Sequence, residues 1–254
     1  MKTQDEGSFT QNGSSEQRDV GVDGLGRLAK LLGVFLEPQK TFKAIGQSSD
    51  WFIPLTACLL LVLIFNIVAV GRMGIGNILR TSLQGNPQAD EIVAAAEDSM
   101  FTKLMIYVAP VISIPISLLA LAGIFLVVLT LAGEDMNYKK VFSVCAYSLF
   151  AYSLGSSFVT LMVIVFTKDF SDFDLRNPLA SNVGYFLNPA ETGKFLHSLA
   201  SSLDLLSFWF LFLLGVGFAA TSPKPNFRKS LTLVVSLWVV YVIGKAGLSN
   251  FFGN

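Results

Sequence analysis

Residues 104–132 read LMIYVAPVISIPISLLALAGIFLVVLTLA, a stretch without a single charged side chain. A hydrocarbon core about 30 Å thick needs about 20 helical residues to cross it. This stretch is therefore long enough to span a bilayer as one helix. Two prolines inside it, Pro110 and Pro115, predict that this helix bends or tilts.

Four further apolar runs occupy residues 52–70, 141–167, 203–221 and 230–249. Only 14% of the 254 residues are charged, whereas an ordinary soluble domain has about 25%. The sequence therefore predicts an all-α, polytopic bundle of five transmembrane helices, with residues 51–250 as one membrane domain. Its first expected partner is the lipid bilayer.

Two segments precede the predicted spans. Residues 1–23 are rich in Ser, Gln, Gly and acids and lack the apolar core of a secretory signal, so we expect a disordered cytoplasmic tail. Residues 24–50 predict short interfacial amphipathic helices, because Leu28, Leu32 and Phe35 recur at helical spacing and Lys30 falls on a different face of the same helix. Pro38 starts the second of these helices.

Two long polar connections are expected at residues 71–103 and 168–202. Gly71, Gly74 and Gly76 indicate a flexible exit from the first span, and the acidic residues 90–99 indicate a short amphipathic helix that leads into the second. The other two connections, residues 133–140 and 222–229, are short and polar.

Lysine and arginine are spread unevenly over these connections, and positive charge is retained on the cytoplasmic side of a membrane. The two short connections hold five cations: Lys139, Lys140, Lys224, Arg228 and Lys229. The two long ones hold only six over nearly seventy residues. We therefore expect the N-terminus inside and the C-terminus outside.

The composition offers little for catalysis or nucleic-acid binding. Lys+Arg and Asp+Glu number 18 each, so no net positive charge favours a nucleic acid. His197 is the only histidine, which rules out sites that need two, and neither a nucleophile elbow nor a phosphate loop is present. Cys58 and Cys145 lie inside apolar runs and are expected to be free thiols. We expect no catalytic site, no metal and no cofactor.

Two sets of polar residues within the spans are candidate sites. Asp204 and Lys245 lie at similar depth in the fourth and fifth spans, so they are a candidate structural ion pair; alternatively, Asp204 caps its helix and Lys245 extends to the headgroups. The third span carries a polar face at helical spacing, made of Ser153, Ser156, Ser157 and Thr160. That face is interpreted as a close helix contact or as the wall of a hydrated path.

Three groups of short stretches are distinctive in combination, and they lie between residues 31 and 249. They are GVFLEPQKTFKAIG at 33–46; LAGED at 131–135 with AYSL at 146–149; and SLDLLSFW at 202–209 with GVGFA at 215–219. In this combination the chain resembles the YIP family, the Ypt-interacting membrane proteins, and in particular its bacterial branch. A proline expected soon after AYSL is replaced by the residues FAY at 150–152, which leaves the bend of the third span open.

The resemblance implies five spans with a cytoplasmic N-terminus, and it implies no chemistry. Eukaryotic members are associated with small GTPases and vesicle traffic, but no contact residue for a GTPase maps onto this sequence, so that role is not transferred. Two functional hypotheses remain. One is a non-catalytic scaffold or adaptor in membrane organisation, with membrane-protein partners or a second copy. The other is a small transporter or permeation protein with a path along the third span.

Overall fold

The computed structural model describes residues 26, 28–83, 86–170 and 181–252, and within these residues every named element is a helix. Four helices are long and apolar enough to cross a membrane: α3 (Phe52–Ser82), α5 (Met100–Leu131), α6 (Tyr138–Phe166) and α10 (Phe227–Phe252). A fifth apolar helix, α9 (Leu205–Thr221), has 17 residues, the lower limit for a span of about 17–25 residues. The predicted all-α bundle is confirmed.

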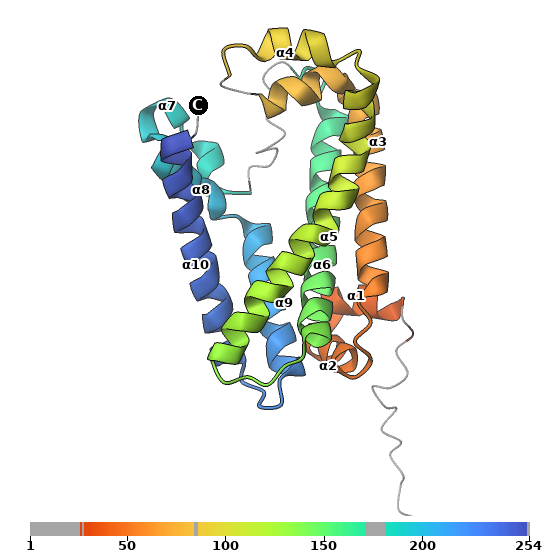
Figure 1. Ribbon diagram of the computed structural model, residues 1–254, viewed down its shortest axis with the longest axis vertical. Helices are drawn as coiled ribbons and strands as arrows, with labels where there is room; N and C mark the ends of the chain where they lie inside the picture. Colours follow the sequence, from red (N-terminus) through yellow and green to blue (C-terminus); the bar gives the residue numbers. More distant parts are fainter. Residues whose placement is uncertain (1–25, 27, 84–85, 171–180, 253–254) are drawn as a thin grey trace, which may run out of the picture.

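Shorter helices lie at the two ends of the bundle (Figure 1). At one end α1 (Ala29–Leu36) and α2 (Pro38–Ser48) accompany the α5–α6 connection and the α9–α10 turn. We call this the lower end. At the upper end lie α4 (Ala89–Ala96), the 3₁₀ helix η2 (Val183–Phe186), α7 (Pro189–Thr192) and α8 (Lys194–Ser202). The predicted disordered tail at residues 1–23 falls outside the described residues.

Local signals set the starts of several helices. Asn137 accepts a hydrogen bond from the Lys140 backbone N–H at 2.9 Å and so caps α6. Asp204 caps α9 in the same way, and Pro38 occupies the first turn of α2, where its missing N–H is not needed. The long α5 continues as a helix through both of its prolines and runs obliquely across the bundle (Figure 1).

The connection predicted for residues 71–103 is partly wrong, because α3 continues to Ser82 beyond a sharp change of direction. The change occurs at Gly74, whose φ of 77° and ψ of 159° are accessible to glycine with little strain. Beyond it, the side chains of Asn77 and Thr81 donate to carbonyls four residues earlier. The helix expected over residues 90–99 is confirmed as α4, whereas η2, α7 and α8 were not predicted.

The core is densest in the lower half of the bundle, around α6. This helix packs against α1, α2, α3, α5 and α9, and its residues 141–148 are all buried. Helix α2 lies against α9, where a Cβ atom on Gly217 would stand 2.4 Å from Val144 Cγ1 and 3.1 Å from the Phe42 ring. Glycine at this position is therefore what allows α2, α6 and α9 to approach one another.

Candidate functional site

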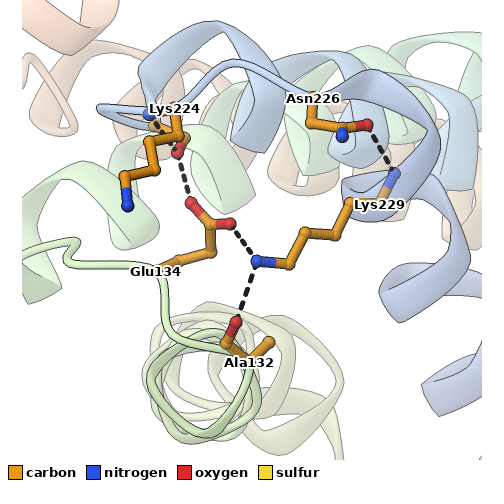
Figure 2. A network of polar contacts seen from close by, with 6 residues as sticks. Ala132, Glu134, Lys224, Asn226 and Lys229 are labelled. Carbon is orange, nitrogen blue, oxygen red and sulfur yellow. Dashed lines mark hydrogen bonds and ion pairs between the residues drawn. The ribbon is translucent and has the colours of Figure 1, made fainter.

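Glu134 forms the centre of a polar network at the lower end (Figure 2). The residue follows Gly133, whose φ of 79° turns the chain out of α5. Although the Glu134 side chain is only 7% exposed, Oε1 accepts a hydrogen bond from Lys229 Nζ at 2.5 Å, and Oε2 accepts one from Ser222 Oγ. Lys229 Nζ also donates to the Ala132 carbonyl at 2.8 Å. The network thus joins the α5–α6 connection to the turn between α9 and α10.

Electrostatics keep this carboxylate charged. The hydrogen bond from Lys229, and then the one from Ser222, lower the pKa of Glu134 below its ordinary value, with Lys224 adding a smaller effect of the same sign. Both carboxylate oxygens already have a donor, so Glu134 is poorly placed to act as a general base. What this arrangement does chemically is to hold two connections of the bundle together.

A second network ties α1 to the end of α2 and to the segment that follows it. The Lys30 side chain is buried, and its Nζ donates to Asp50 Oδ2 at 2.9 Å and to Ser48 Oγ at 2.7 Å. A buried cation needs such partners, because unpaired burial is costly. Sequence reasoning placed Lys30 on the polar face of α1 but missed that this face is the one that packs on the protein.

Neither network resembles a metal or cofactor site. Across the part of the chain that the structure describes, no group of three or more His, Cys, Asp or Glu residues is arranged to hold a metal ion.

The sequence model of the Yip1 domain matches residues 32–247, which run from within α1 to within α10. The chain belongs to the Yip1 domain family. No curated protein and no solved structure matches it. The family resemblance read from the sequence is confirmed, whereas the match does not support its assignment to the bacterial branch. With its apolar helices, this Yip1 domain makes the chain an integral, multi-pass membrane protein.

The ion pair predicted between Asp204 and Lys245 of this Yip1 domain stays a prediction. Asp204 accepts hydrogen bonds from the Ser207 backbone N–H at 2.9 Å and from Ser181 Oγ at 2.5 Å. Lys245 donates to Ser202 Oγ at 3.4 Å. Among the described residues no ion pair within 4.0 Å joins Asp204 to Lys245, so the observed contacts are those of the alternative interpretation, a helix cap and a separate lysine.

The polar face of α6 contacts its neighbouring helices. Ser153 Oγ accepts a hydrogen bond from Cys58 Sγ of α3 at 3.4 Å, and Thr160 is buried. Ser156 and Ser157 are half-buried on the same helix. Both cysteines are buried free thiols, as predicted. The Glu134 and Lys30 networks were missed as sites; only the LAGED stretch, noted for its resemblance, pointed to Glu134.

Proposed function

We propose that this Yip1 domain protein is a non-catalytic scaffold or adaptor in membrane organisation, which holds membrane-protein partners, or a second copy, at its lower end. The observation that carries the proposal is the pair of partly buried ionic networks. One fixes α1 to the segment after α2, and the other fixes the α5–α6 connection to α10. Together they make the lower end a rigid surface assembled from segments far apart in the sequence, which is what a docking platform requires.

The proposal includes five crossings, with α9 as the fourth, the N-terminus cytoplasmic and the C-terminus outside. Its support is that α1, α2 and both cation-rich short connections gather at the lower end, whereas the long connections gather at the upper end (Figure 1). Reporter fusions after residue 254 test this topology. A C-terminal fusion that is active only in the cytoplasm would contradict it.

Permeation along α6 is the second hypothesis, and the contacts of the polar face favour it less. A path needs hydroxyls that face water, but Ser153 is engaged by Cys58 and Thr160 is buried. Small and hydroxyl residues at such positions are typical of helix contacts in membranes. These contacts support the packing interpretation of the face.

The experiment places a photo-reactive amino acid at Gln39 or Lys43, both exposed on α2, in cells that express the full chain. A matched control carries it at Glu91, exposed on α4 at the upper end. We expect the same membrane-protein partner, or a second copy, to be captured from both α2 positions and not from position 91. Absence of a protein adduct at both α2 positions, together with solute flux through proteoliposomes, would favour the transporter instead.

A further inference from the structure

Helix α1 presents an apolar face outward, away from the protein core. Leu28, Leu32 and Leu36 recur every four residues from the start of α1, so they share one face, and they are 73%, 66% and 81% exposed. The opposite side buries Lys30 and Val34 against the protein. A helix at a water-facing surface turns its polar residues outward. An outward leucine face is instead what a helix embedded in a membrane interface presents.

The leucine face continues a surface that already meets lipid. Figure 1 shows α1 lying across the lower ends of the long helices rather than along them. Lys30 of α1 is paired with Asp50, and the next two residues, Trp51 and Phe52, begin the membrane helix α3 and are both exposed. Aromatic residues at the start of a span mark the headgroup level of a bilayer. The leucines thus belong to the level at which headgroups meet acyl chains.

Charge at the lower end is complementary to an anionic lipid surface. The lower end has eight Lys and Arg against four Asp and Glu, counted over residues 28–51, 132–140 and 222–229. The upper end has five Lys and Arg against seven Asp and Glu, counted over its described residues 71–83, 86–103, 167–170 and 181–204. Of the lower-end cations, Lys139, Lys224 and Arg228 are exposed and form no ion pair with any described residue. Glu134, the acid nearest to Lys224 in the network, is already paired with Lys229.

We propose that the lower end is a binding surface for anionic lipids: the leucine face of α1 enters the adjacent leaflet, and Lys139, Lys224 and Arg228 bind the phosphate groups of its lipids. The cations attract anionic headgroups, and the leucines add apolar contact with the acyl chains beneath them. This activity goes beyond the scaffold role and requires no protein partner.

The first test measures lipid preference with the full chain in nanodiscs of equal phosphatidylcholine and phosphatidylglycerol, by association of spin-labelled lipids of each kind. The preference for phosphatidylglycerol over phosphatidylcholine should fall by about fivefold or more in the triple variant Lys139→Gln, Lys224→Gln, Arg228→Gln. The matched control removes three upper-end cations, as Lys103→Gln, Lys168→Gln, Lys194→Gln, and should keep the preference. An equal loss in both variants, or no preference in the unchanged protein, would overturn the proposal.

The second test locates α1 directly. Because Cys58 and Cys145 are buried, a thiol-reactive nitroxide added to the folded Leu32→Cys protein should label position 32 selectively. Its collision rate should be higher with oxygen, which concentrates in the acyl region, than with a water-soluble nickel complex. The control Gln39→Cys, on an exposed position of α2, should show the reverse. A label at position 32 that collides more often with the nickel complex than with oxygen would refute the insertion of α1. This result would leave the scaffold proposal untouched, because the collision rates do not depend on a protein partner.

Discussion

Removal of the Lys229 ammonium should destabilise the protein measurably, because it leaves the Glu134 carboxylate buried with one side-chain donor, Ser222. Breaking a fully buried ion pair costs about 3–5 kcal/mol, and an exposed pair contributes about 0–1 kcal/mol. The Glu134 side chain is 7% exposed, but that of Lys229 is 41% exposed, so water reaches the site from one side. We therefore expect Lys229→Met to lower the free energy of unfolding by about 1–3 kcal/mol.

The double-mutant cycle isolates the interaction. Glu134→Gln removes the charge but keeps a carbonyl acceptor, so it should cost about 1 kcal/mol, and combining it with Lys229→Met should recover about 1–2 kcal/mol of the summed loss. Unfolding of the purified protein by increasing SDS in mixed micelles measures each variant. The exposed pair of Lys103 and Asp98, 3.9 Å apart with side chains 43% and 101% exposed, is the matched control. A coupling energy no larger than in that control would refute the reasoning.

Three further predictions use the same unfolding assay. The pKa of Glu134 is lowered in the folded protein, so its contribution to the free energy of unfolding is complete above the unfolded pKa of about 4.3 and is lost as pH falls through the lower folded pKa. In that acid range the unchanged protein should therefore lose stability relative to Glu134→Gln. Gly217→Ala should cost about 1–3 kcal/mol, since its methyl group would stand 2.4 Å from a valine of α6; Gly123→Ala in α5, which meets nothing within 4 Å, should gain about 0.5–1 kcal/mol. Asp204→Ala should cost about 1 kcal/mol as a lost helix cap and add independently to Lys245→Met, whereas a coupling above about 0.5 kcal/mol would establish their ion pair.

The five apolar helices were predictable because a bilayer leaves the backbone no alternative to an internally bonded helix. Local chemistry also predicted the start of α2 at Pro38. The ionic networks were not predictable, because Glu134 and Lys229 are 95 residues apart and meet only after the helices between them have packed. No local pattern encodes such a distant contact. The same applies to Lys30, whose spacing in α1 identified its face but not which face meets the protein. Gly74 indicated a flexible exit from the first span, but not that the helix resumes after it.

The packing of α2 on α9 also sets an order of events during synthesis. Helix α2 is among the first elements to leave the ribosome, whereas α9 is next to last. Phe42, fully buried in the finished protein, is covered in part by α9 at Gly217, so a nascent chain that has not reached residue 205 still exposes this side of α2. Transiently exposed apolar surface is what chaperones and quality-control proteases detect. The packing at the lower end is therefore complete only after α9 has been made. A chain truncated before α9 should be degraded rather than accumulate in the membrane.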